Sequence, residues 1–399
     1  MRITAIICEF NPLHNGHAML LNRARQNTNA DAILCIMSGN FTQRAEPAIV
    51  DSRTRATMAL KCGADLVVEL PALYSTACAD KFSEASINIA NSIKHVTHLA
   101  FGSECGDIKL LQSAAQVQAS ESKEFKLELK QHLDNGKSYA NALSLATQNA
   151  LDNDFDLNMP NDILGIEYIK QLYKSNSSIK PITISRQGSN HHDKIAQGEF
   201  CSATALRTLL NDKNFAAAKK VMPKIAFDII KDDLSKHSVD FELFNFLTLA
   251  SLRLNDLSNC PDSGEGLENK LKKSALECTN LLDAFDKTKS KRYTMARIRR
   301  LCLQVLFGIT HYPNISDLSI PAKLIGINAN LKTKLLPLLP KNIIVQNKDF
   351  DLYINTLKKE QQADCQYIES INEKAGLLYP LLQKKNGLFY KNQPLICNS

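Results

Sequence analysis

The start of the chain, from Met1 to Asn27, constrains the fold more than any other stretch. Ile3–Cys8 is an apolar run typical of a buried strand, and Ala18–Asn27 has the composition of a helix. The loop between them contains His14, Gly16 and His17. This order predicts a strand, a tight loop and a helix N-terminus, whose unpaired backbone N–H groups attract anions. Two histidines three residues apart can face one point above that N-terminus; the alternative is two partly exposed histidines at a helix cap.

The alternation of strand and helix continues through the first half of the chain. Further buried strands are predicted at 32–37, 66–70, 98–101 and 181–185. Helices are predicted at 51–61 (with Asp51 as the cap), 80–92 and 163–174, and residues 106–150 look helical and polar. Short strands separated by helices indicate parallel βαβ units. Ligands bind at the carboxyl ends of such strands, and the loops after the first, second, fourth and fifth strands are polar, so we expect the site there.

From about residue 212 the pattern becomes almost entirely helical. Helices are predicted at 241–254 and 295–309, a loop at 259–268, and a small extended element at 343–345 or 351–354. The predicted fold class is α/β. We expect a Rossmann-like parallel-sheet domain at 1–211 and a mostly α-helical domain at 212–399.

Composition limits the class of protein. A chain of 399 residues is long for a single core. The eleven cysteines form no CxxC pair, which is typical of reduced thiols in a cytoplasmic protein. We expect no secretory signal and no membrane-spanning helix, because no apolar run in the sequence is long enough to cross a bilayer. The net charge of +7 is compatible with a polyanionic partner.

Several later residues are suited to anions. Arg186 follows the fifth strand and can bind phosphate bidentately. Ser202, Thr204 and Arg207 lie at a hydroxyl-rich helix start, where hydroxyls and N–H groups can hold phosphates. Arg53 and Arg55, near the start of their helix, oppose the helix dipole, which favours either an anionic ligand or a solvated face.

Two glycine- or asparagine-bearing positions complete the candidate nucleotide site. Gly102 ends the fourth strand, where backbone can lie against a base or ribose. Asn161 lies at a helix start, where a simple helix cap is the alternative interpretation. His191, His192 and Asp193 are contiguous and point in different directions, so no metal site is predicted.

A basic segment lies in the helical half. Residues 287–300 contain seven lysines and arginines and no acid. Like charges without a compensating acid repel one another, which favours a phosphate backbone as partner over a merely solvated face. The residues that we expect to contact RNA are Lys289, Lys291, Arg292, Arg297 and Arg300.

These motifs together resemble a known family. The first loop resembles the HxGH signature of nucleotidyltransferases, and residues 201–207 resemble their SSTxIR element, with Ala203 in place of a serine. The wider set is similar to the bacterial tRNA(Met) cytidine acetate ligase family over residues 1 to about 310; it comprises 8–17, 37–41, 43–44, 46–49, 63–71, 101–104, 161–168, 291–293 and 297–300. Ala45 and Asp162 stand where that family is expected to have Gly and Asn.

The resemblance implies an ATP-dependent ligase. ATP would activate acetate as acetyl-adenylate, and the acetyl group would pass to the exocyclic amine of the wobble cytidine of elongator tRNA(Met). The catalytic residues implied are His14 and His17, as holders of the ATP phosphates. The ATP contacts implied are Ile7, Cys8, Glu9, Phe10, Asn11, Pro12, Leu13, His14, Asn15, Gly16, His17, Ala18, Met19, Leu20, Gly102, Asn161, Arg186, Ser202, Thr204 and Arg207.

Three points stay open in the sequence. Mg²⁺ is expected to accompany ATP, but no dedicated protein ligands are identified. The acetate pocket is expected near Glu9–Asn11 or Asn40. The rival functions are an adenylyltransferase acting on a small phosphorylated metabolite and a non-catalytic RNA-binding protein; the oligomeric state is not predicted.

Overall fold

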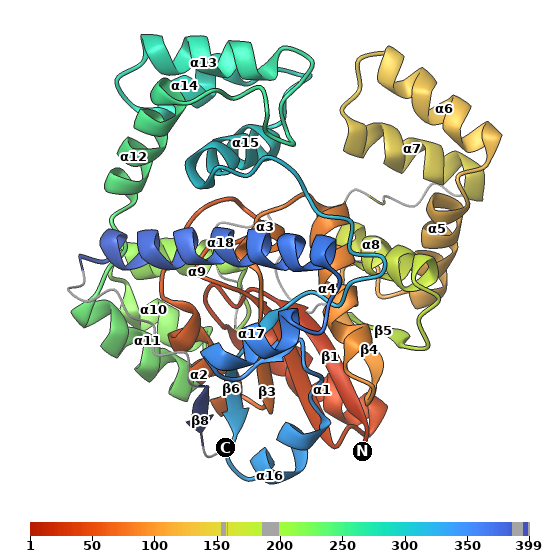
Figure 1. The fold of residues 1–399 in the computed structure, drawn as a ribbon, viewed down its shortest axis with the longest axis vertical. Helices are drawn as coiled ribbons and strands as arrows, with labels where there is room; N and C mark the ends of the chain where they lie inside the picture. The colour runs from red at the N-terminus through yellow and green to blue at the C-terminus, as the bar shows by residue number, and fades with distance from the viewer. Residues whose placement is uncertain (153–156, 158, 186–198, 385–393, 398–399) are drawn as a thin grey trace.

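One mixed sheet organises the molecule. The computed structural model describes residues 1–152, 157, 159–185, 199–384 and 394–397. Within them the strand order is β5-β4-β1-β2-β3-β6-β7, with β8 beside β6 (Figure 1). The strands are β1 (Ile3–Cys8), β2 (Ala32–Ser38), β3 (Leu66–Leu70), β4 (Val96–Ser103), β5 (Lys180–Ser185), β6 (Ala322–Asn328), β7 (Ile343–Ile344) and β8 (Leu395–Cys397).

The first five strands are all parallel, as the sequence predicts. β1 pairs with β2 in the register Ile3 to Ala32, β2 with β3, β1 with β4, and β4 with β5. β2 is buried along its whole length, which explains why its sequence is a continuous apolar run rather than an alternating one. The α/β fold class is therefore confirmed.

Helices of the first half connect these strands. They are α1 (Asn15–Thr28), α2 (Ser52–Lys61), α3 (Ala72–Ser75), α4 (Ala79–Ser92), α5 (Ile108–Ser120), α6 (Lys123–Asp134), α7 (Tyr139–Leu151), α8 (Pro160–Lys174) and α9 (Ala203–Asn211). The cap predicted at Asp51 is confirmed, because its carboxylate accepts the N–H of Thr54 at 2.8 Å. α1 begins three residues earlier than predicted, so both loop histidines belong to its start.

The second half is mostly helical but returns to the sheet. Its helices are α10 (Phe215–Lys220), α11 (Lys224–Lys236), α12 (Phe241–Leu254), α13 (Leu267–Glu277), α14 (Leu281–Thr288), α15 (Met295–Phe307), α16 (Lys332–Leu335), α17 (Asn347–Ile354) and α18 (Lys359–Leu382). The extended element at 343–345 is confirmed as β7, whereas 351–354 is helical. β6, which the sequence analysis missed, runs antiparallel to β3. The sheet thus receives strands from both sides of residue 212, and separate folding of 1–211 and 212–399 stays a prediction.

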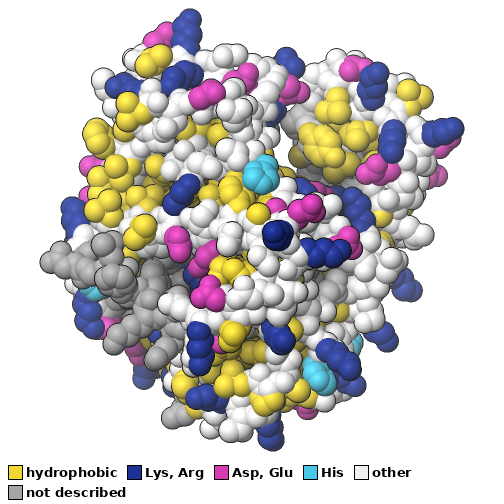
Figure 2. Space-filling model, viewed as in Figure 1, with side chains coloured by type: hydrophobic (Ala, Val, Ile, Leu, Met, Phe, Trp, Pro, Cys, Tyr) yellow, Lys and Arg dark blue, Asp and Glu magenta, His cyan; other side chains and the backbone are white. Residues whose placement is uncertain are grey.

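Three apolar cores hold these layers. Two lie on opposite faces of the sheet; α4, α8 and α18 contribute to one, and α1, α2, α9 and α11 to the other. The third lies among α12–α15 alone. In Figure 1 the α12–α15 lobe and the α6–α7 hairpin stand apart above the sheet. Figure 2 shows a hollow between these two projections, with hydrophobic side chains gathered on the hairpin beside it.

Candidate functional site

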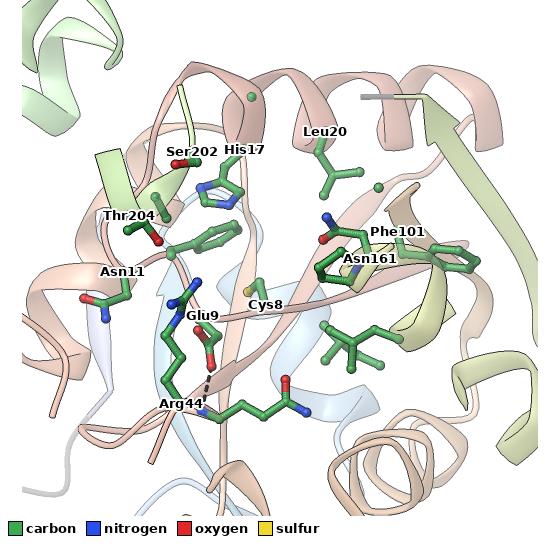
Figure 3. A pocket seen from close by; sticks show the side chains of 18 of the residues that line it. Cys8, Glu9, Asn11, His17, Leu20, Arg44, Phe101, Asn161, Ser202 and Thr204 are labelled. Carbon is green, nitrogen blue, oxygen red and sulfur yellow. Dashed lines mark hydrogen bonds between the residues drawn. The ribbon is translucent and has the colours of Figure 1, made fainter. Parts of the chain in front are cut away.

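A cavity of about 500 Å³ lies at the carboxyl ends of the parallel strands (Figure 3). The loops after β1 and β2 line it, as the sequence predicts. The carboxyl-terminal ends of β4 and β5, the starts of α1, α4, α8 and α9 and two residues of α15 complete the lining. The start of α4 was missed, although the strand-end rule applies to β3 as well. The predicted ATP contacts that line the cavity are Ile7, Cys8, Glu9, Phe10, Asn11, His14, Gly16, His17, Met19, Leu20, Gly102, Asn161, Ser202, Thr204 and Arg207.

Not every predicted contact lies on the cavity wall. Pro12, Leu13, Asn15 and Ala18 belong to the same loop and helix but are absent from the lining. Asn15 instead donates its side-chain N–H to the carbonyls of Glu199 and Lys220, at 2.8 and 3.2 Å. It therefore fixes the start of α1 against the segment around α10. Arg186, predicted to bind phosphate, lies outside the described residues.

The two histidines form the start of α1. His14 is the N-cap, and its Nδ1 accepts the Gly16 N–H at 3.1 Å. The Nδ1 of His17 accepts the His14 N–H at 3.3 Å, and the two rings stack with centroids 3.7 Å apart. In the neutral ring, a nitrogen that accepts a backbone N–H leaves the proton on the other nitrogen. Each imidazole therefore carries its proton on Nε2 and is a donor, which suits anionic oxygens.

Arg55 is a buried structural residue that binds the backbone of the loops beside the cavity. It is fully buried, and it donates to the carbonyls of Glu9 at 2.6 Å and Ser38 at 3.1 Å, and also to that of Gly39. Its Nε donates to the carbonyl of Val50 at 3.2 Å. Both sequence interpretations, an anionic ligand and a solvated face, are wrong for this side chain. Arg55 thus joins the ends of β1 and β2 through their backbone carbonyls.

Glu9 is the single carboxylate among the described residues that line the cavity. Its Oε1 accepts the backbone N–H of Gln43 at 2.7 Å (Figure 3). Burial raises the pKa of Glu9 above its ordinary value, and the hydrogen bond from Gln43 and the positive charges of Arg44, Arg55 and Arg207 oppose that rise. A carboxylate is thus held in place among three guanidinium groups.

The end of β4 and the start of α8 are locked together by two carboxylates. Glu104 accepts the backbone N–H groups of Asn161 and Asp162 at 3.1 Å each, and the Asn161 side-chain N–H at 2.5 Å. Asp162, fully buried, accepts the Ser103 hydroxyl at 2.5 Å and the Glu104 N–H at 3.0 Å. Asn161 is not the helix cap, because Met159 holds that position. Glu104, which the sequence analysis did not single out, orients Asn161 beside the cavity.

The start of α9 adds hydroxyl groups and a cation. Ser202 is the N-cap and accepts the Ala205 N–H at 3.1 Å. Arg207 donates to the carbonyl of Asn11 at 2.9 Å and to the Thr204 hydroxyl at 3.1 Å. Burial, reinforced by the charge of Arg44, lowers the pKa of Arg207 from its ordinary value. The bond to Asn11 joins α9 to the histidine loop, although the two are far apart in the sequence.

The predicted acetate positions separate in the structure. Glu9 and Asn11 line the cavity, whereas Asn40 does not. The side-chain oxygen of Asn40 accepts the Ser52 N–H at 2.7 Å, so Asn40 stabilises the loop before α2. The Asn11 oxygen accepts the Ile49 N–H at 3.0 Å, and in Figure 3 this side chain points away from the centre of the cavity.

The basic segment is partly neutralised by acids that are distant in sequence. Arg300 binds both oxygens of Asp262, at 2.8 and 3.0 Å. Arg297 binds Glu265 at 2.8 Å, and Arg292 lies 3.7 Å from the same carboxylate. The expectation of uncompensated charge is therefore wrong for these arginines.

The remaining basic residues differ in exposure and place. Lys289 and Lys291 are exposed. Arg300 and Ala296 line the cavity, so α15 forms part of the site as well as of the helical lobe. Arg299 of the same helix binds Glu46 at 3.0 Å, which ties α15 to the loop that carries Gln43 and Arg44.

The described residues show neither of two other kinds of site. In the described ranges, no group of three or more His, Cys, Asp and Glu side chains is arranged to hold a metal ion. Among the helices in those ranges, none combines the length and apolarity needed to cross a membrane.

Comparisons with known proteins converge on one group. The family described as HIGH Nucleotidyl Transferase matches residues 1–391. The tRNA(Met) cytidine acetate ligase of Clostridium novyi is 41% identical over 78% of this chain and 80% of its own length. That of Clostridium acetobutylicum is 36% identical over 90% and 94%.

Two solved structures are similar to this chain over its whole length. The apo crystal structure of Thermotoga maritima TmcAL is similar with a TM-score of 0.93 and 27% identity, and each chain is covered completely. A second crystal form of that protein, bound with alpha-thio ATP, is similar with a TM-score of 0.91.

Proposed function

The chain belongs to the tRNA(Met) cytidine acetate ligase family, and on that premise we propose that it acetylates the wobble cytidine of elongator tRNA(Met) in the cytoplasm. ATP and acetate form acetyl-adenylate with release of pyrophosphate. The exocyclic amine of the cytidine then attacks the acetyl carbonyl, and AMP leaves. The observation that carries the proposal is the cavity at the strand ends, because it joins the histidine loop, the α9 start and α15 in one site.

The cavity supplies what adenylation requires. Acetate needs alignment with the α-phosphate, and the growing negative charge needs fixed donors rather than a protein nucleophile. The Nε2–H groups of His14 and His17 and the N–H groups at the starts of α1 and α9 are such donors. Arg207 adds a positive charge that is oriented by Asn11 and Thr204. We assign the ATP phosphates to this side of the cavity, with Mg²⁺ as their counter-ion.

The base and ribose are assigned to the opposite side. Gly102 of β4 and Asn161 of α8 line the cavity there, and Phe101 packs against Tyr168 with ring centroids 5.9 Å apart. Figure 3 shows Asn161 and Phe101 across the cavity from Ser202 and Thr204. An aromatic wall and an oriented amide suit a purine and its sugar.

The acceptor RNA is assigned to the α12–α15 lobe. Lys289 and Lys291 are exposed on the segment that leads into α15, and Ala296 and Arg300 of α15 reach the cavity. A phosphate backbone bound by the two lysines would therefore lie beside the site that holds the adenylate. Residues 212–399 supply this lobe, so their tRNA-binding role is part of the proposal.

The test supplies ATP, labelled acetate and a tRNA(Met) transcript. Label is expected on the RNA, and its absence would refute the ligase proposal. Transfer of AMP from ATP labelled at the α-phosphate to a small phosphorylated metabolite, without any need for acetate, would instead favour an adenylyltransferase. His17→Ala is expected to lower transfer by about 10²–10³-fold, the loss typical of one donor to a developing anion, with tRNA binding retained. Asp232→Asn is the matched control, because Asp232 is an exposed partner of Lys236 on α11.

A further inference from the structure

The transfer step requires a proton acceptor that the phosphate-binding residues do not supply. An exocyclic amine that becomes an amide must lose one proton. We propose that the Glu9 carboxylate takes this proton from the amine of the acceptor cytidine, and the proposal rests on the ligase function proposed above.

The histidines are unsuited to this task. In both rings Nδ1 already accepts a backbone N–H, from Gly16 and from His14. The remaining nitrogen of each neutral ring carries a proton, so each ring can donate a hydrogen bond but has no acceptor position to offer the amine. Their bonding makes them holders of anionic oxygens.

The other ionisable groups on the wall are also unsuited. Burial raises the pKa of the Cys8 thiol and of the Tyr168 hydroxyl well above their ordinary values, so both stay protonated near neutral pH. The same holds for Cys201, whose pKa burial raises to about 11. Arg44 is a cation and accepts no proton. Among the described lining residues, Glu9 is the single carboxylate, and in its ionised form it can accept a proton.

The position of Glu9 fits a base. Its Oε1 is fixed by the Gln43 N–H at 2.7 Å. In the view of Figure 3, Glu9 and Arg44 lie on one side of the cavity and His17 and Ser202 on the other. An acetyl-adenylate whose phosphate is held by the histidine side would therefore leave the carboxylate facing the centre, where the reacting acetyl carbon lies.

The link to α15 places the acceptor on the same side. Gln43 and Arg44 belong to the loop that Arg299 holds through Glu46 at 3.0 Å. Arg299 lies on the helix whose Arg300 lines the cavity. RNA that binds this lobe would thus bring its cytidine towards the loop that orients Glu9.

The surroundings of Glu9 give its carboxylate a suitable strength as a base. Burial raises its pKa, which makes it a stronger base than a free glutamate, while Arg44, Arg55 and Arg207 limit the rise. The three guanidinium groups also give the surroundings of Glu9 a net positive charge. The carboxylate therefore does not by itself prevent acetate or the phosphates from entering.

The transfer step needs only the amine, the acetyl-adenylate and Glu9. The amine nitrogen forms a bond to the acetyl carbonyl carbon, and its proton passes to Glu9. The bond between that carbon and the phosphate oxygen breaks, and AMP leaves with the electron pair. Glu9 then releases the proton to solvent, so no further co-reactant is needed.

The experiment separates the two half-reactions in Glu9→Gln. Glutamine keeps an oxygen that can accept the Gln43 N–H but cannot take a proton. Adenylation is measured as acetate-dependent exchange between pyrophosphate and ATP, in the presence of a tRNA(Met) transcript with uridine at the wobble position, which has no amine to acylate. Transfer is measured in a single turnover with the normal transcript.

The expected result is selective. Transfer should fall by about 10²–10⁴-fold, the range for one general base, while exchange stays within about threefold of the wild type; retained exchange also shows that the variant is folded. Transfer in the wild type should rise with pH and level off as Glu9 ionises, and this plateau should be missing in Glu9→Gln. Asp232→Asn is expected to match the wild type in both assays.

Three outcomes would overturn the proposal in distinguishable ways. Equal loss of exchange and transfer would make Glu9 a residue of nucleotide or acetate binding. Unchanged transfer would exclude it as the base. Absence of label on tRNA with the wild-type protein would overturn the ligase function itself, and the role of Glu9 with it.

Discussion

Replacing the buried Arg55 tests whether one side chain holds the ends of β1 and β2 together. Arg55 donates to four backbone carbonyls, those of Glu9, Ser38, Gly39 and Val50. Arg55→Met leaves all four without this donor inside the protein, and each unpaired buried group costs about 1–3 kcal/mol. Removing a buried charge returns part of that loss, so we expect a net destabilisation of about 3–5 kcal/mol.

A destabilisation of this size is measurable as a change in Tm. Unfolding entropy is about 2.1 cal/mol/K per residue, which gives roughly 0.8 kcal/mol/K for a chain of this length. The expected fall in Tm is therefore about 4–6 °C, measured by scanning calorimetry. Arg55→Lys is the matched variant, because it keeps the charge but lacks the planar fork that reaches several carbonyls; an intermediate Tm is expected.

The same substitution should affect function. The Arg55 bond to the Glu9 carbonyl fixes the turn that carries the Glu9 side chain, so Arg55→Met should also raise the KM for ATP. An Arg55→Met variant whose free energy of unfolding lies within about 1 kcal/mol of the wild-type value, and whose KM for ATP is unchanged, would refute the inference that Arg55 joins the two strand ends.

Three further predictions use other parts of the site. A Cβ at Gly165 would lie 2.5 Å from the Phe101 ring, so Gly165→Ala should cost about 1–3 kcal/mol and raise the KM for ATP; an unchanged KM would show that the ring does not shape the nucleotide site. Glu9→Gln should be more stable than the wild type at pH 7–8 in urea unfolding, because burial raises the folded-state pKa of Glu9 from 4.5 and ionisation of Glu9 then disfavours folding. This gain in stability should vanish below about pH 4.5, where the carboxyl is protonated in both states. A gain in stability only at acid pH would contradict the predicted direction. Replacing Lys289 and Lys291 by Ala should reduce the salt dependence of tRNA binding by about one to two phosphate contacts, with the KM for ATP unchanged, and an unaltered salt slope would exclude these lysines from the RNA contact.

The sequence by itself determined the parallel sheet and most of the cavity wall. β1–β5 lie where short apolar runs predict them, because a parallel strand that is buried on both faces consists of consecutive apolar residues. The helix starts at His14, Asp51 and Ser202 are likewise local, since a cap and its N–H partner lie within three residues. Once these strands and helix starts are placed, the strand-end rule brings their loops to one edge of the sheet.

Only the tertiary structure decided which charged groups face the cavity. From the sequence, Arg55 is expected to bind an anion or to face solvent, and Arg297 and Arg300 are expected to be uncompensated charges. Most of their acceptors lie elsewhere along the chain, on segments that only folding brings near. β6 was missed for a related reason, because it joins the sheet through pairing with β3, which lies far earlier in the sequence. The sequence gives the type of each side chain, whereas its partners and its exposure to water depend on which distant segments pack against it. These partners and this exposure decide whether a charged side chain stabilises the fold or takes part in the chemistry.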